Sequence, residues 1–116
     1  MCGIAGIVVL NENVSIEHAS LVQRMCSTLK HRGPDDEAYF ADKRMSLGMT
    51  RLAILDLRQG LYPVTNENNT VCLFYNGEIY NYRELTDELS SLGHKFISNT
   101  DAEVVVHAYE EWGTTA

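Results

Sequence analysis

The sequence contains few of the residues that mark disulfide-rich or metal-binding proteins. Its 116 residues include three cysteines, an odd number, and no two of them form a C-x-x-C pair. This usage disfavours a disulfide framework and fits a reducing compartment, so we expect a cytoplasmic protein. We also expect no metal site, because the four histidines lack the spacing of zinc ligands. They are His18, His31, His94 and His107.

The chain also lacks a long apolar segment and an excess of positive charge. The apolar run from Ile4 to Leu10 is too short to span a membrane, and no basic residue precedes it as in a signal peptide. The formal net charge of -7 at pH 7 disfavours nucleic acid and anionic membranes as partners. We therefore expect neither a membrane nor a nucleic-acid partner.

The composition is that of an ordinary globular protein, and the chain is long enough for one small domain. The expected helices begin at the caps Ser15, Asn81 and Thr100 and end near Lys30, Gly93 and Trp112. The expected strands are Ile4–Leu10, Glu37–Ala41, Met45–Met49, Leu52–Leu57, Val71–Tyr75 and Lys95–Ser98. This order predicts an α+β fold with helices packed on an antiparallel meander. No strand follows the last helix to close the sheet, so we expect a fold truncated on its C-terminal side.

A cysteine directly follows the initiator methionine. A small second residue permits removal of Met1, which leaves Cys2 with a free α-amino group. Such an amine has an ordinary pKa of about 8, so much of it is a neutral base near pH 7. A thiol nucleophile and its base then lie on one residue. Taken alone, a cysteine at position two is weak evidence for catalysis.

Five motifs that follow one another along the chain strengthen the evidence for catalysis. They are Cys2-Gly3-Ile4-Ala5-Gly6, His31-Arg32-Gly33-Pro34-Asp35, Arg51-Leu52-Ala53-Ile54-Leu55-Asp56, Asn76-Gly77-Glu78-Ile79-Tyr80-Asn81 and Thr100-Asp101-Ala102-Glu103. In this order and spacing they resemble the class II glutamine amidotransferase domain of glutamine-hydrolysing asparagine synthetases. The resemblance implies an N-terminal-nucleophile fold, an αββα sandwich of mainly antiparallel sheets, of which residues 1–116 are the N-terminal part. It also implies hydrolysis of glutamine to glutamate and ammonia through a thioester on the cysteine.

The resemblance assigns roles to individual residues. Cys2 matches the nucleophile, and Asn76 and Gly77 match the oxyanion hole. The glutamine-binding positions are Arg51 for the α-carboxylate, Asp101 and Glu78 for the α-amino group, and Leu52, Ile54 and Leu55 for the lining of the pocket. Cys26 and Cys72 are expected in the core. Arg32 and Asp35 are interpreted as residues that hold their loop.

Each of these assignments has a simpler alternative. Asn76-Gly77 is also the commonest sequence of a type I′ hairpin turn. Arg51 fits a surface charge at the end of a strand, and Asp101 fits the first turn of a helix, where negative charge is favoured. For an isolated residue these structural explanations would be preferred.

The resemblance also implies partners that are absent from this chain. In the family a C-terminal synthetase domain binds ATP and Mg²⁺ and uses the ammonia to make asparagine from aspartate, so we expect no cofactor in residues 1–116. A homodimer is a further expectation. Two alternatives remain open: a non-catalytic module that binds a small molecule or a partner, and a glutaminase whose ammonia goes to a different acceptor.

Overall fold

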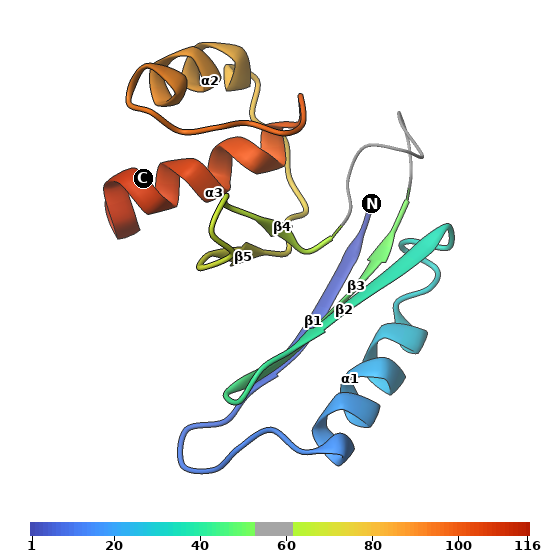
Figure 1. The fold of residues 1–116 in the computed structure, drawn as a ribbon. Coiled ribbons are helices and arrows are strands. Elements are labelled where there is room, and N and C mark those ends of the chain that lie inside the picture. The colour runs from blue at the N-terminus through green and yellow to red at the C-terminus, as the bar shows by residue number, and fades with distance from the viewer. Residues whose placement is uncertain (53–61) are drawn as a thin grey trace. The chain divides into compact units, whose positions relative to one another are not determined.

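The computed structural model describes residues 1–52 and 62–116 (Figure 1). The chain divides into two compact units, Met1–Leu55 and Asp56–Ala116. Both units combine helix with antiparallel strands, which confirms the predicted α+β class. No helix in the described part of the chain is long and apolar enough to cross a membrane.

The first unit is a three-stranded sheet with one helix. Its strands are β1 (Gly3–Val8), β2 (Asp36–Ala41) and β3 (Met45–Arg51), arranged in the order β1-β3-β2 with every pair antiparallel. Helix α1 (Ile16–Thr28) packs against all three strands (Figure 1). A small core of Ala5 from β1 with Val22 and Cys26 from α1 joins the two layers.

Side chains satisfy backbone groups at the start of α1 and in the β2–β3 hairpin. Ser15 caps α1, as the sequence predicted, and the structure adds a capping box in which the Ser15 hydroxyl accepts the His18 N–H and the His18 ring accepts the Ser15 N–H. In the β2–β3 hairpin, the Asp42 carboxylate accepts the backbone N–H groups of Arg44 and Met45 at 2.7 and 2.8 Å. These two bonds lower the pKa of Asp42.

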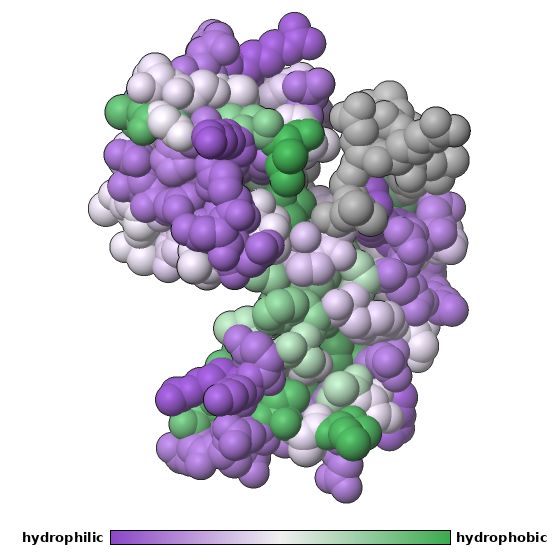
Figure 2. Space-filling model, viewed as in Figure 1, coloured by the Kyte–Doolittle hydropathy of each residue, from purple (hydrophilic) through white to green (hydrophobic). Residues whose placement is uncertain are grey.

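One face of the sheet keeps apolar residues at the surface. Along β1 side chains alternate, so that Ala5 lies in the core while Ile4 and Val8 are 44% and 62% exposed. Figure 2 shows hydrophobic residues of this kind among the hydrophilic ones. Ile4 and Val8 of the edge strand β1 are therefore apolar residues at the surface, whereas Met49, which pairs with Ile4 in β3, is buried.

The second unit is a helix pair with a short hairpin. The hairpin consists of β4 (Val64–Thr65) and β5 (Cys72–Leu73), which are antiparallel. Helices α2 (Tyr82–Ser91) and α3 (Asp101–Trp112) pack together, α3 also contacts both strands, and the short helix η1 (Gly113–Thr115) follows. The sequence predicted both long helices. Gly93 follows α2 with a φ of 106°, a conformation that suits glycine and ends the helix.

The structure corrects several predicted strands. Lys95–Ser98 is a loop, because the N–H groups of Ile97 and Ser98 donate to the Glu103 carboxylate at 2.7 Å instead of to a strand. The predicted Val71–Tyr75 strand shortens to Cys72–Leu73, and its partner β4 was not predicted. The strands therefore form two sheets and not one meander. The predicted Leu52–Leu57 strand lies, apart from Leu52, outside the described residues.

The caps of α2 and α3 also differ from the prediction. Asn81 and Thr100 occupy the cap positions, but neither side chain bonds to its helix. Glu103, three residues after Thr100, accepts the N–H groups of Ile97 and Ser98 and not that of Thr100. The helix starts were thus predicted correctly and their hydrogen bonds were not.

Candidate active site

Cys2 lies immediately before β1, at the end of the sheet where β3 finishes. Gly3 pairs with Thr50, so the antiparallel register brings Cys2 next to Arg51, the last residue of β3. Cys2 is half-buried, and the Arg32 side chain donates from Nε to its carbonyl oxygen at 3.2 Å. The start of the chain is therefore fixed by a side chain from the loop that follows α1.

The same loop also holds the end of β3. The Asp35 N–H donates to the Arg51 carbonyl oxygen at 3.0 Å. Gly33 is buried so close to β3 that a Cβ atom there would lie 2.5 Å from the Arg51 nitrogen and from the Thr50 carbonyl group. Only glycine permits this approach. The His31–Asp36 segment thus contacts both Cys2 and Arg51, through the Arg32 side chain and the Asp35 backbone.

Arg51 is paired across the sheet. Asp36 faces it in the β2–β3 register, and the Arg51 Nη1 lies 3.7 Å from the Asp36 Oδ2. The Arg51 side chain is 16% exposed, whereas the Asp36 side chain is 63% exposed. A guanidinium has five donors in a planar fork that matches the two oxygens of a carboxylate.

In the second unit, Asn76, Gly77 and Glu78 form an exposed segment between β5 and α2. Asp101, in the first turn of α3, anchors this segment, because its Oδ2 accepts the Ile79 N–H at 2.9 Å. The structure therefore brings Asp101 close to a segment that lies 22 positions earlier in the chain.

Tyr75 lies beside Gly77, and the acidic residues nearby affect the pKa of its hydroxyl. Burial and then the negative charges of Asp101 and Glu78 raise the pKa of its hydroxyl. Its ring also lies under Gly77, where a Cβ atom would come within 2.7 Å of the Tyr75 oxygen. The sequence analysis did not assign Tyr75 a place beside the site, because a tyrosine at the end of a strand is most often packing.

The structure contradicts one of the simpler explanations of these residues and confirms another. The Asn76-Gly77 hairpin turn is wrong, because these residues connect β5 to a helix and not to another strand. The first-turn position of Asp101 is confirmed, although its carboxylate also bonds to Ile79. Leu52 is half-buried just after β3. Ile54 and Leu55 lie outside the described residues.

The other two cysteines are in different environments. Cys26 is completely buried in the core, as predicted. Its burial, followed by the nearby Glu37 charge, raises the pKa of its thiol. A raised pKa lowers the fraction of reactive thiolate. Cys72 is half-buried in β5.

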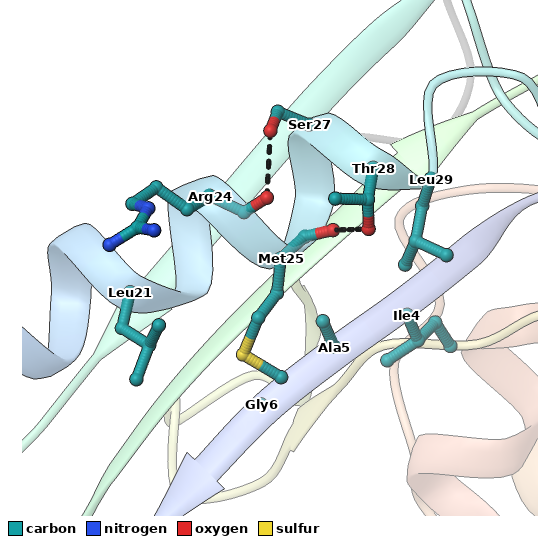
Figure 3. A pocket seen from close by; sticks show the side chains of 9 residues that line it. All are labelled: Ile4, Ala5, Gly6, Leu21, Arg24, Met25, Ser27, Thr28 and Leu29. Atoms are coloured by element: carbon teal, nitrogen blue, oxygen red, sulfur yellow. Dashed lines mark hydrogen bonds between the residues drawn. The ribbon is translucent and has the colours of Figure 1, made fainter.

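A groove of about 740 Å³ runs between β1 and α1 (Figure 3). Its walls are mainly apolar, with Ile4 and Leu29 among them, and Arg24 is the one charged residue in its lining. Free glutamine needs partners for a carboxylate and an ammonium group. Among the residues that the structure describes, its lining includes none of the predicted glutamine-binding residues, and we do not assign glutamine to it.

The first unit thus holds Cys2 before β1 with Arg51 beside it, and the second unit holds the exposed Asn76-Gly77 segment. The chain belongs to the glutamine amidotransferase domain family, whose model matches residues 1–116.

Within that class the most informative relatives are synthetases. The chain is 43% identical to glutamine-hydrolysing asparagine synthetase 2 of Bacillus subtilis over 114 residues, which are 97% of this chain and 15% of the relative. It is 40% identical to the glutamine-hydrolysing asparagine synthetase of Zea mays over 113 residues, 97% of this chain and 19% of the relative. A probable glutamine-hydrolysing asparagine synthetase of Dictyostelium discoideum is 40% identical over 118 residues, 97% of this chain and 20% of the relative. The chain thus spans 15–20% of the length of these relatives.

Proposed function

We propose that this chain is the glutaminase part of an asparagine synthetase-like enzyme, with Cys2 as its nucleophile. The observation that carries the proposal is the position of Cys2. It lies next to Arg51 in the β1–β3 register and is held by Arg32. Cys2 and Arg51 lie at the same end of one sheet, which supports their proposed roles as the nucleophile and as the cation for the substrate carboxylate.

The chemistry requires removal of Met1, whose exposed fraction is 68%. The Cys2 thiol then gives its proton to its own α-amine, and the thiolate attacks the side-chain amide carbon of glutamine. The C–N bond breaks as the ammonium group returns the proton to the departing ammonia. Water next attacks the γ-glutamyl thioester, which releases glutamate and regenerates the thiol.

Other residues bind the substrate and stabilise the oxyanion. The Asn76 side-chain amide and the Gly77 N–H donate to the oxyanion that forms on the amide carbon, a contribution of roughly 3–4 kcal/mol each in comparable sites. Arg51 binds the α-carboxylate, and Asp101 and Glu78 bind the α-amino group. Leu52, Ile54 and Leu55 line the pocket.

At the scale of the domain, we extend the proposal to the αββα sandwich of the N-terminal-nucleophile fold. The antiparallel sheet with α1 on one face and apolar Ile4 and Val8 on the other supports it, because a second sheet would bury that apolar face.

The ammonia is proposed to go to a C-terminal synthetase domain that binds ATP and Mg²⁺ and acts on aspartate. The relatives, which are named as synthetases and are five or more times longer, support this partner. A glutaminase that serves a different acceptor would share every residue discussed above.

Covalent labelling of the intact protein tests the nucleophile. A glutamine analogue with a diazoketone group should alkylate Cys2 of a chain that lacks Met1, and peptide mass spectrometry should show Cys26 and Cys72 unmodified. The Cys2→Ala variant should lose glutamine hydrolysis and labelling together.

Two results would contradict the proposal. An active protein that retains Met1 has no α-amine on Cys2, so the mechanism would be wrong. Glutamine hydrolysis that persists in Cys2→Ala would mean that another residue attacks. A wild-type protein that binds glutamine without hydrolysing it would support the non-catalytic binding module instead.

A further inference from the structure

Two histidines that are distant in sequence meet in the second unit. His94 and His107 have ring centroids 5.0 Å apart, and the Phe96 ring lies 4.4 Å from that of His107. The His107 side chain is 1% exposed, and neither of its ring nitrogens has a hydrogen-bond partner among the described residues. Leaving two buried polar nitrogens unpaired is costly, so His107 requires an explanation.

Two glutamates complete a group of four ligand atoms around the histidines. One such atom from each of Glu67, His94, His107 and Glu110 lies within 4.8 Å of all the others. We call these four residues the two-histidine cluster. The Nδ1 of His107 is 3.8 Å from the Glu67 Oε2 and 3.9 Å from the Glu110 Oε2, and the Nδ1 of His94 is 3.6 Å from the Glu110 Oε2.

These separations are too long for hydrogen bonds and close to those between the ligands of one metal ion. Zinc bonds to nitrogen and oxygen at about 2.0–2.1 Å, which gives a tetrahedral edge of about 3.3 Å. The three printed distances exceed that edge by about 0.3–0.6 Å, and all four ligand atoms lie within 4.8 Å of one another, so the side chains must draw together by up to about 1.5 Å to hold one ion.

The opposite ring nitrogens face carboxylates outside the cluster. His94 places Nε2 at 3.1 Å from the Glu111 Oε2, and His107 places Nε2 at 3.5 Å from the Glu103 Oε1. A carboxylate on the far nitrogen is the common second contact of a metal-bound histidine, since it fixes the proton there and leaves the other nitrogen unprotonated. The Glu111 contact thus orients the His94 ring with Nδ1 toward the Glu110 carboxylate, whereas Glu103 makes no hydrogen bond to His107.

The backbone of the second unit positions each ligand. The left-handed Gly93 turns the chain so that the His94 N–H donates to the Leu89 carbonyl oxygen at 3.1 Å. His107 and Glu110 are three residues apart on α3 and so share one face of the helix.

Glu67 comes from the β4–β5 loop. The buried Asn66 shapes this loop by accepting the N–H groups of Thr70 and Val71, each at 2.9 Å. The Lys95 N–H holds the other Glu67 oxygen at 2.6 Å.

We propose that the two-histidine cluster is a structural Zn²⁺ site that ties the β4–β5 loop and the α2–α3 loop to α3. The set of two imidazoles and two carboxylates suits zinc, and its four ligands would close the coordination sphere. The two carboxylates balance the charge of the ion. Both are partly exposed, which gives the ion a path from solvent.

Metal titration of the intact protein tests the site independently of glutamine hydrolysis. After treatment with a chelator, and with excess Mg²⁺ present to fill sites for hard cations, the protein is titrated with Zn²⁺ by calorimetry and with Co²⁺ by visible absorption. We expect one ion per chain, the absorption of tetrahedral Co²⁺ and its displacement by Zn²⁺.

Variants of several cluster residues test where the ion binds, so that the conclusion does not depend on one substitution. His94→Ala and Glu110→Gln should each lose the stoichiometric site, and Glu111→Gln should weaken it on the order of 10–100-fold because it orients His94. His31→Ala and Glu84→Gln are the matched controls in other parts of the chain and should bind like the wild type. Circular dichroism should show that all five variants are folded, and Zn²⁺ should raise the unfolding temperature of the wild type and the controls, that of Glu111→Gln less, and that of His94→Ala and Glu110→Gln not at all.

The proposal is overturned if the wild type binds no stoichiometric Zn²⁺, if Co²⁺ shows only six-coordinate absorption, or if His94→Ala and Glu110→Gln bind as tightly as the controls. In the first case His107 is a buried member of an ion-pair network without a metal.

Discussion

At the scale of single residues, the structure separates groups that hold the site from groups that are proposed to react. Arg32 donates to the Cys2 carbonyl oxygen and so positions the nucleophile without touching the substrate. Asp101 uses one carboxylate oxygen to hold Ile79, so its other oxygen is the one that the proposal assigns to the substrate. Motifs contain both kinds of residue and do not distinguish them.

Arg51 and Asn76 should differ in which kinetic constant they control. Arg51→Ala removes a partner of the substrate carboxylate that is present before and during the reaction, so KM for glutamine should rise more than kcat falls. Asn76→Ala removes a donor that is needed once the oxyanion forms, so kcat should fall on the order of 10²–10³-fold with little change in KM. Steady-state glutaminase assays of the intact protein measure both constants.

Arg44→Ala is the matched control for Arg51, because it removes an exposed arginine from the hairpin of the same sheet. It should leave both constants unchanged. The opposite pattern, in which Asn76 controls KM and Arg51 controls kcat, would contradict the two assignments.

At the scale of elements, the site depends on one close approach of a loop to a strand. Gly33→Ala would place a Cβ atom 2.5 Å from the backbone of Thr50 and Arg51, which cannot move without disturbing β3. We expect a loss of about 3 kcal/mol in local stability, at the upper end of the usual cost of overpacking. Hydrogen exchange of the β3 amides measures it, and labelling of Cys2 by the glutamine analogue should slow in parallel.

Gly93→Ala is the comparison, since this glycine has open space around it but a φ of 106°. It should cost about 1–2 kcal/mol through its left-handed conformation alone and leave the β3 amides unaffected. Equal effects of the two variants on β3 would show that Gly33 matters for flexibility and not for the close approach.

The helix caps give a second prediction at this scale. Ser15→Ala removes the hydroxyl that accepts the His18 N–H, so α1 should lose about 1 kcal/mol. Thr100→Ala should cost α3 only a few tenths of that, because the Thr100 side chain makes no cap hydrogen bond. Hydrogen exchange in the first turns of α1 and α3 compares them, and equal losses would contradict the caps that the structure shows.

At the scale of the whole molecule, the proposal joins a glutaminase to a separate reaction that consumes ammonia. Free ammonia bypasses glutamine hydrolysis, so Cys2→Ala in the intact protein should make no product from glutamine and normal amounts from added ammonium salt. Product analysis with aspartate and ATP measures this. If Cys2→Ala also lost the ammonia-dependent reaction, its defect would be structural, and if aspartate gave no product in the wild type, the acceptor would be a different one.

Much of the fold could be predicted from the sequence because local patterns determine it. The apolar spacing and start signals of α1, α2 and α3, and the turn at Asp42, depend on neighbouring residues, and the structure confirms them. The Lys95–Ser98 strand was wrong because the amides of Ile97 and Ser98 bind a carboxylate from the next helix. A two-residue strand such as β4 is too short to give a recognisable pattern.

The sequence by itself determined the family and the residues proposed for catalysis, because a cysteine after Met1 and a set of ordered motifs can be recognised from the order of residues along the chain. Only the tertiary structure decided that Arg32 binds Cys2 and that Gly33 packs against Arg51. It also decided that Glu67, His94 and His107 lie close together. Those contacts join residues far apart in the chain, and their formation depends on the sheet register and on the packing of loops against α3. The spacing of the histidines in the sequence argued against a metal, whereas folding brings a ligand atom of each to within 4.8 Å of the other and of two carboxylates.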